Sequence, residues 1–155
     1  MTDEAEAAEG VQVQLALIAQ YLKDLSFENP NAPAILQELQ SAKPNVNVNV
    51  NVNAQKIGQD GYEVVLSLAT EAKIGDKVAF IVEVDYAALW GIRGVTEEQL
   101  QPVLLVECPR LMFPFARSIL ADAIREGGFP QVLLDPIDFA GLFRQQQTAS
   151  QQTMN

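Results

Sequence analysis

The segment at positions 45–53 alternates strictly between asparagine and valine, and it restricts the possible folds more than any other part of the 155-residue chain. Successive side chains of a β-strand point to opposite faces, so the four valines can lie on one face and the five asparagines on the other. An Asn-rich tract can also be disordered or prone to aggregation, but the interleaved β-branched valines favour an ordered strand. The alternation therefore predicts a half-buried strand whose valine face contacts an apolar core.

Three other segments, at 11–21, 62–70 and 78–86, show the same two-residue period. Their alternating apolar residues are Val11, Val13, Leu15, Leu17 and Ala19, then Val64, Leu66 and Leu68, then Val78, Phe80, Val82, Val84 and Tyr86. A short loop that contains Gly75 joins the last two segments as a hairpin. Four consecutive strands without an intervening helix predict a four-stranded antiparallel sheet.

A long helix is predicted after the fourth strand, from Thr96 to about Glu126. Thr96 and Gln99 have the spacing of a capping box, in which both side chains satisfy free backbone N–H groups at a helix start. Apolar residues then recur every three or four positions. Pro102, Pro109 and Pro114 each remove a helical hydrogen bond, so the helix should be kinked or interrupted.

The predicted helix is apolar on more than one face, whereas a single sheet can cover only one of them. We therefore expect copies of the chain to associate through this helix. The residues predicted in the contact between copies are Leu104, Cys108, Met112, Phe115 and Ile119. Cys108 is the only cysteine, so no intrachain disulfide can form, and its apolar neighbours predict a buried, inert thiol.

A second helix is predicted to begin with Asp135 as its N-cap and Pro136 in its first turn, and to continue through Phe143. The Gln-rich residues 145–155 and the acidic residues 1–10 are predicted to be flexible ends. Residues 11–144 then form a single domain. The predicted fold class is α+β, with a four-stranded antiparallel sheet followed by a long kinked helix and a shorter C-terminal helix.

The composition argues against several chemical functions. The net charge of −10 opposes binding to a phosphate backbone, so no nucleic-acid partner is expected. The chain has no histidine, which excludes a His-dependent catalytic triad and His-ligated zinc, and a single cysteine cannot supply a Cys-based metal site. There is no P-loop motif, and the spacing of the carboxylates singles out no catalytic pair. We expect no catalytic residues, no metal, no cofactor and no enzymatic activity.

Gly91 and Gly94 have the spacing of the GXXG loop of KH domains. In an acidic chain, a plain glycine turn between the fourth strand and the long helix is the better interpretation.

The N-terminal ten residues carry four acidic residues and no lysine or arginine, the opposite of a signal peptide. No apolar run approaches the roughly 18 residues that a membrane span needs. A soluble, cytoplasmic protein is expected.

Two surfaces are predicted from the strand periods and the loops. If Phe80 and Val82 face the core, Ile81, Glu83 and Asp85 face the other way, and Glu63 and Glu71 of the third strand add to an acidic face. Two long loops, at 29–44 and 127–136, combine prolines with apolar residues. Such loops either close over the core or line an apolar groove, and acidic faces often serve only solubility, so both functions stay open at this point.

Several ordered blocks of the sequence resemble the SecB family of protein-export chaperones. The blocks are YLKDLSFENPNAP at 21–33, YEVVL at 62–66, AFIVEV at 79–84, CP at 108–109, FPFAR at 113–117 and GFPQ at 128–131. The resemblance covers about residues 11–143. It implies a homotetramer that is a dimer of dimers, an ATP-independent holdase that binds unfolded precursor proteins, and delivery of these clients to the ATPase SecA.

The resemblance also implies two sets of site residues. Asp24, Glu28, Ile81 and Glu83 match positions that contact SecA in the family. The two loops match those that flank the family's client-binding groove, and the groove residues expected here are Ile35, Leu36, Leu39, Phe129, Val132, Leu133 and Leu134. This chain has aliphatic residues where family members often have an aromatic one in the first loop, and its tail is Gln-rich where theirs is acidic.

Two alternatives remain open. A SecB-like chaperone with a dedicated client, such as a toxin–antitoxin system, would have the same fold and groove but another partner. An enzyme or carrier for acyl groups, or another small apolar-ligand binding protein, would instead use the apolar loops as a pocket.

Overall fold

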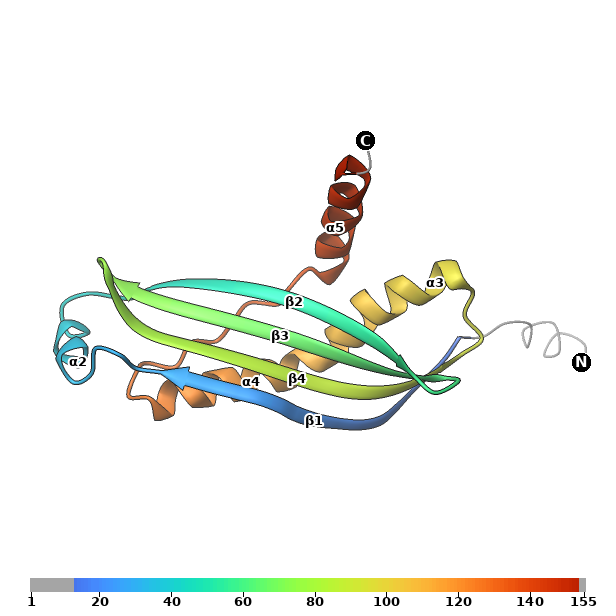
Figure 1. Cartoon of the computed structure of the whole chain (residues 1–155). Helices are drawn as coiled ribbons and strands as arrows, with labels where there is room; N and C mark the ends of the chain where they lie inside the picture. The colour runs from blue at the N-terminus through green and yellow to red at the C-terminus, as the bar shows by residue number, and fades with distance from the viewer. Residues whose placement is uncertain (1–12, 154–155) are drawn as a thin grey trace, which may run out of the picture.

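The computed structural model describes residues 13–153, which form one sheet with the long helix packed against one of its faces (Figure 1). The predicted flexible segment 1–10 and the expected start of the first strand at Val11 lie outside the described residues.

The sheet consists of four antiparallel strands, as predicted. They are β1 (Gln14–Glu28), β2 (Asn45–Ile57), β3 (Gly61–Ile74) and β4 (Lys77–Arg93). Their order across the sheet is β1-β4-β3-β2, so β1 and β2 are the two edge strands. All four strands extend beyond the segments in which the sequence alternates cleanly. The fourth continues through Arg93, so Gly91 lies inside β4, and the glycine turn is reduced to Gly94, which has a φ of 75°.

Two irregularities explain why β1 runs seven residues past its predicted end. The pairing of β1 with β4 shifts between Leu17 and Ala19 and again between Leu22 and Asp24. Each shift inserts one residue into β1, which reverses the alternation of the residues that follow. The strand therefore persists although its sequence period is interrupted.

The long helix is divided into three parts, as its prolines predicted. The parts are α3 (Glu97–Pro102), a π-helical turn η1 (Val103–Glu107) and α4 (Cys108–Glu126). The capping box of Thr96 and Gln99 is present at the start of α3. A short helix, α2 (Ala34–Glu38), lies within the first long loop.

The core lies between α4 and the inner faces of β3 and β4. The residues of these strands that were predicted to face inward, such as Leu66, Phe80 and Val82, are buried. Phe80 packs with Phe27 and Phe129, whose ring centroids lie 6.2 and 4.9 Å from its own.

The C-terminal helix differs from its prediction. Helix α5 spans Phe139–Thr153, and its first turn is capped by Asp138, whose carboxylate accepts a hydrogen bond of 3.1 Å from the backbone N–H of Gly141. Asp135 is therefore not the N-cap. The Gln-rich residues up to Thr153 continue the helix, since glutamine is a good helix former even without an apolar stripe. None of the described helices is both long and apolar enough to cross a membrane.

Candidate functional site

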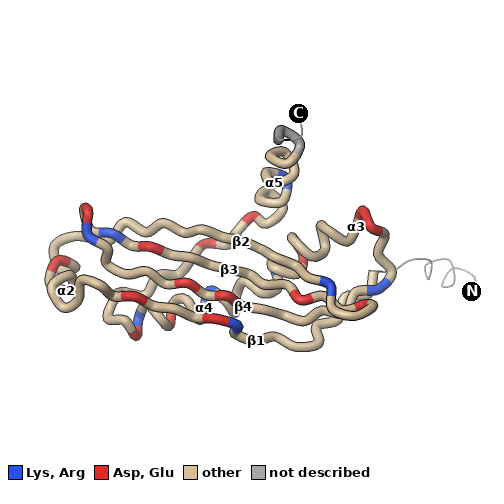
Figure 2. Tube along the Cα trace, viewed as in Figure 1, with Lys and Arg blue, Asp and Glu red and all other residues tan. Residues whose placement is uncertain are grey.

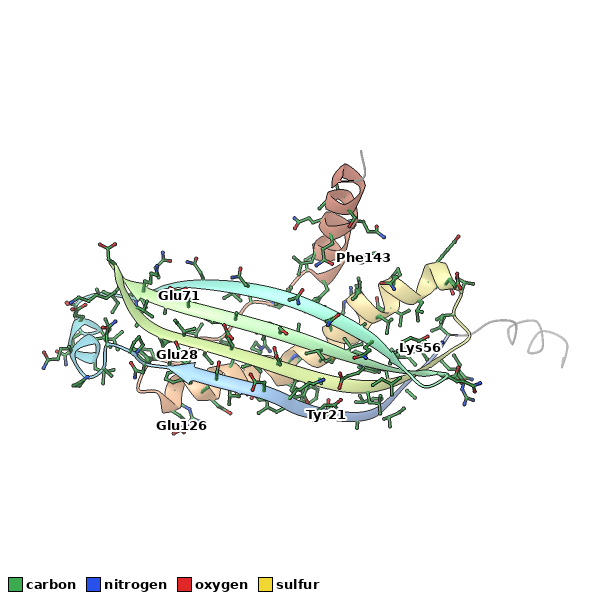
Figure 3. All side chains as sticks on the ribbon, viewed as in Figure 1. Tyr21, Glu28, Lys56, Glu71, Glu126 and Phe143 are labelled. Atoms are coloured by element: carbon green, nitrogen blue, oxygen red, sulfur yellow. The ribbon has the colours of Figure 1, made fainter. Side chains whose placement is uncertain are left out.

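The outer face of the sheet, opposite α4, carries the acidic surface that the sequence predicted. The strand register places Glu28 opposite Ile81, and Ser26 opposite Glu83. Asp24, Glu28 and Glu83 are exposed, and Ile81 is half-buried among them. Acidic residues of β1, β3 and β4 gather in the half of the sheet nearer α2, where Glu28 and Glu71 also lie (Figures 2 and 3). We call this half of the outer face the acidic face.

A shallow depression of about 430 Å³ lies within the acidic face. Ala69 pairs with Asn49 on one side and with Glu83 on the other, so a small side chain lies between longer polar ones. Glu71, Ile81 and Asn47 also line the depression, together with Val48 and Thr70. The depression can receive a basic side chain, with carboxylates for its charge and Ile81 for its aliphatic stem. Asn47 and Asn49 were not predicted at this site, because an amide carries no charge to single it out.

Glu63 is not part of the exposed acidic face, contrary to the prediction. Its carboxylate accepts hydrogen bonds from Lys23, at 2.7 Å, and from the Tyr21 hydroxyl, and its side chain is only 11% exposed. Lys23 and Tyr21 belong to β1, whereas Glu63 belongs to β3, so the contacts cross the intervening strand β4. This network connects the edge strand to the centre of the sheet.

Replacing Glu63 with glutamine is expected to lower the stability of the sheet in a pH-dependent way. The hydrogen bonds from Lys23 and Tyr21 hold the pKa of Glu63 below its ordinary value. Their stabilising effect is therefore complete above the ordinary pKa and is lost as the pH falls through the lowered one. At pH 7 we expect Glu63→Gln to cost about 1 kcal/mol, or roughly 2–4 °C of melting temperature. The melting temperatures of the two proteins should draw together as the pH falls below the ordinary glutamate pKa of about 4.3; a difference that stays constant with pH would contradict this role.

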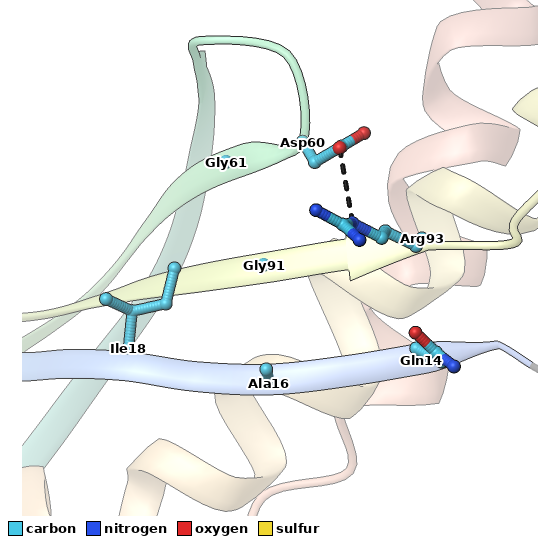
Figure 4. A pocket seen from close by; sticks show the side chains of 7 residues that line it. All are labelled: Gln14, Ala16, Ile18, Asp60, Gly61, Gly91 and Arg93. Carbon is cyan, nitrogen blue, oxygen red and sulfur yellow. Dashed lines mark ion pairs between the residues drawn. The ribbon is translucent and has the colours of Figure 1, made fainter.

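The other half of the outer face has an apolar floor. Gly61 and Gly91 pair directly across β3 and β4, and Ala16 and Ile18 of β1 lie beside them (Figure 4). These residues form the floor of a second depression in the outer face. Its two charged side chains, Asp60 and Arg93, form an ion pair of 3.3 Å. The excess of negative charge on the outer face is thus confined to the acidic face.

Two depressions lie beside the edge strand β2, one mainly apolar and the other lined by both apolar and polar residues. The first, of about 420 Å³, lies between the valines of β2 and the segment at residues 127–138, which we call the connecting loop. Its lining residues are Val46, Val48, Val50, Val132, Leu133, Leu134, Asp135 and Ile137. The second lies farther along β2 and is lined by Val52, Asn53, Ala54, Lys56, Tyr62, Leu100, Gln101, Leu104 and Leu105. We call both depressions together the β2 groove.

The structure divides the predicted groove residues into two groups. Ile35, Phe129 and Leu134 are 1%, 4% and 9% exposed, because the two loops close over the core at these positions. Leu36, Leu39 and Val132 are half-buried, and Leu133 is 69% exposed. Leu36 and Leu39 lie on α2 and the turn that follows it, outside the lining of the β2 groove. The valines of β2 were missed, although their one-sided alternation was the signal that could have identified them.

The chain matches the family model of "Preprotein translocase subunit SecB" over residues 8–150. It is 50% identical over 144 residues to the protein-export protein SecB of Rhodopseudomonas palustris, a match that covers 93% of this chain and 91% of the relative. It is 55% identical over 140 residues to that of Rhizorhabdus wittichii, covering 90% and 82%. The chain belongs to the SecB family.

A solved structure has the same fold as this SecB-family chain. It is a SecB-like chaperone of Mycobacterium tuberculosis in complex with a peptide from the HigA1 antitoxin. The two structures superpose with a TM-score of 0.62 at 16% sequence identity, over 79% of this chain and 90% of the other. The α+β class and the four-stranded antiparallel sheet predicted from the sequence are confirmed.

The predicted contact residues of this SecB-family chain, on η1 and α4, fall into two groups, one buried and one partly exposed. Leu104, Cys108 and Met112 are buried in the core of the single chain, which leaves them no surface for another copy and corrects that part of the prediction. Burial also raises the pKa of the Cys108 thiol to about 12, as expected for an inert thiol. Phe115 is 48% exposed and Ile119 half-buried, so these two remain available.

An apolar surface beside β1 was not predicted. Leu17, Leu22 and Leu25 lie on the inner face of this edge strand, yet they are 42–47% exposed because α4 covers β3 and β4 instead. Leu111 and Phe115 of α4 are also about half exposed. We call these five residues the uncovered apolar surface.

Proposed function

We propose that this member of the SecB family is an ATP-independent holdase of protein export. It binds unfolded secretory precursors in the cytoplasm and delivers them to the ATPase SecA. The observation that carries the proposal is an apolar groove beside a free sheet edge, in a chain 50–55% identical to two proteins named for protein export.

The β2 groove suits an extended, unfolded client. No described strand pairs with the outer edge of β2, so its backbone N–H and C=O groups can pair with a client strand. The groove follows β2 from Val46 to Ala54, which is roughly 26 Å at about 3.3 Å per residue. Main-chain pairing gives affinity without a required sequence, and the apolar lining accepts alternate side chains. Many different clients can therefore be held without nucleotide.

The acidic face is the proposed contact for SecA. Asp24, Glu28, Ile81 and Glu83 lie together on the outer side of the sheet, away from the valine face of β2. Basic side chains of SecA can enter the depression around Ala69. Client and SecA can then bind at the same time, as delivery requires.

The proposed assembly is a homotetramer arranged as a dimer of dimers. The uncovered apolar surface combines a free edge strand with half-exposed side chains of α4, and such surfaces in water are typical of subunit contacts. A tetramer would place several β2 grooves on one particle. Each further contact with a long client would then be intramolecular, which raises the avidity.

Family membership favours this role over the alternatives. Relatives at 50–55% identity are named for protein export, whereas the structure solved with an antitoxin peptide is only 16% identical and supports the fold alone. The SecB family is one of chaperones, which argues against an enzyme or acyl carrier.

The proposed function is tested by Leu133→Asp, which places a charge in the β2 groove. Leu133 is 69% exposed, so the variant should fold. Losing the burial of a leucine against a client costs about 1.5–3 kcal/mol, so the Kd should rise about tenfold or more. We would titrate reduced, carboxymethylated α-lactalbumin, which cannot refold and is itself acidic, so that charge attraction cannot account for its binding.

The matched control is Ile57→Asp, at an exposed apolar position of β2 outside the groove lining. This variant should bind the unfolded client as the wild type does. The holdase proposal fails if the wild type binds native and unfolded α-lactalbumin equally, or if it leaves an unfolded client free to aggregate without ATP. If Leu133→Asp and the wild type bound the unfolded client with equal affinity, the β2 groove would be excluded as the client site.

A further inference from the structure

The middle of the connecting loop is held by one side chain of α4. The ends of the loop are well anchored: the Phe129 ring is buried against Phe80, and Phe139 packs against Phe113 at 6.1 Å. Among the described residues, the only backbone group between Pro130 and Pro136 that takes part in a hydrogen bond is the Leu134 carbonyl.

The donor to that carbonyl is Arg117. Its Nη1 lies 3.3 Å from the Leu134 oxygen, in a partly buried position. The guanidinium also lies over the ring of Phe113, 5.4 Å from the centroid, one helical turn earlier on α4. No carboxylate of a described residue lies within ion-pair distance of it. The Arg117 guanidinium thus lies between the Phe113 ring, which packs against one end of the connecting loop, and the Leu134 carbonyl at the middle of the loop.

The two loop leucines beside this contact differ sharply in exposure. Leu134 is 9% exposed and its neighbour Leu133 is 69% exposed, an alternation typical of an extended segment. A shift of one residue would exchange the two, with Leu133 turned inward and Leu134 outward. A hydrogen bond to the backbone at Leu134 opposes such a shift, because it fixes the chain itself rather than a side chain.

We propose that Arg117 is a positioning residue for client binding: its hydrogen bond to the Leu134 carbonyl holds the connecting loop in the register that presents Leu133 to the client. The inference rests on the proposed holdase function. Arginine suits the role because its planar group can stack on Phe113 and donate in a fixed direction at the same time, which the ammonium of lysine cannot do.

The first test measures the loop without any client. Arg117→Met keeps an apolar stem but no hydrogen-bond donor. In hydrogen exchange followed by mass spectrometry, the protection of peptides covering 127–138 should be about tenfold lower in this variant than in the wild type. Arg117→Lys should lie between this variant and the wild type. The control is Arg110→Lys, on the same helix, where the arginine is exposed and paired with Glu107. This control should exchange as the wild type does.

The second test uses a cycle of variants to separate positioning from loss of structure. With reduced, carboxymethylated α-lactalbumin as the probe, Arg117→Met should raise the Kd about tenfold through faster dissociation. In the Arg117→Met background, Leu133→Asp should raise the Kd by a much smaller factor than it does in the wild type, because Leu133 no longer faces the client. SecA binding should stay unchanged, which a general loss of folding would not allow.

The outcomes distinguish the two proposals. If the wild type does not bind the unfolded probe, the holdase function fails, whatever the exchange of the loop. If the wild type binds and Arg117→Met leaves exchange and affinity unchanged, Arg117 has no positioning role. Additive effects of Arg117→Met and Leu133→Asp would also overturn the inference, since independent residues give additive free energies.

Discussion

Replacing Phe115 with aspartate is expected to break the proposed tetramer into smaller species while each chain stays folded. Phe115 stacks on Tyr86 of the same chain, at 6.2 Å, but about half of its surface is uncovered. In a single chain, the aspartate can reach water beside the position that Phe115 leaves. In the assembly it would be an unpaired charge in an apolar contact, which costs several kcal/mol. Symmetry repeats this cost at equivalent contacts.

The measurement is the mass in solution by light scattering at micromolar concentration, with circular dichroism as the folding control. The wild type should have four times the chain mass of 17.0 kDa, and Phe115→Asp should have less. Leu133→Asp is a matched control, because it places the same charge on an exposed apolar residue outside the uncovered apolar surface. A wild type of single-chain mass would contradict the proposed assembly. A folded Phe115→Asp protein with the wild-type mass would exclude this part of α4 from the contact.

The sheet was predictable because its inward residues alternate over long stretches, and the limits of the prediction lie where the alternation stops. In β4, Ala87 and Ala88 are consecutive and both fully buried, so no two-residue period marks that part of the strand. Ala87 is on the outer face, opposite Tyr21 of β1, whose side chain reaches across to Glu63. A residue can therefore be buried on the exposed face of a sheet by long side chains from a neighbouring strand.

The acidic face was located from sequence because strand alternation assigns each side chain to a face. What alternation cannot assign is the partner of a side chain. Glu63 and Lys23 are 40 residues apart, and the strand order that brings them within reach is not visible in the local pattern. Glu63 therefore appeared to be an exposed acid like Glu83, although its charge is satisfied within the chain.

The burial of the residues expected in the groove and in the contact between copies was predicted less well, for a related reason. Apolar residues in a loop or on a helix are equally consistent with a core and with a binding surface. Ile35 and Phe129 turned out to be core residues, whereas Leu133 is exposed. The distinction depends on where α4 lies on the sheet: it leaves β1 uncovered and leaves the valines of β2 facing the connecting loop.

Reversing the charge of Glu83 is expected to weaken SecA binding at least tenfold and to leave client binding unchanged. Glu83 is exposed on the outer face and borders the depression around Ala69. A lysine there would repel the basic side chains that we expect SecA to present, and added salt should weaken the wild-type complex by screening. The β2 groove lies on the opposite side of the sheet and is largely apolar between β2 and the connecting loop, so its affinity for the client should not change.

The experiment titrates SecA and, separately, reduced and carboxymethylated α-lactalbumin against three proteins: the wild type, Glu83→Lys and Glu126→Lys. The last variant makes the same change in net charge at the end of α4, where the side chain is 77% exposed and a lysine is favourable near the helix C-terminus. If overall charge alone governed SecA binding, both variants would lose it equally. A local role for the acidic face requires that only Glu83→Lys does so. Equal loss of client binding in Glu83→Lys would mean that the two surfaces are not separate, because a residue of the outer face would then contribute to the groove.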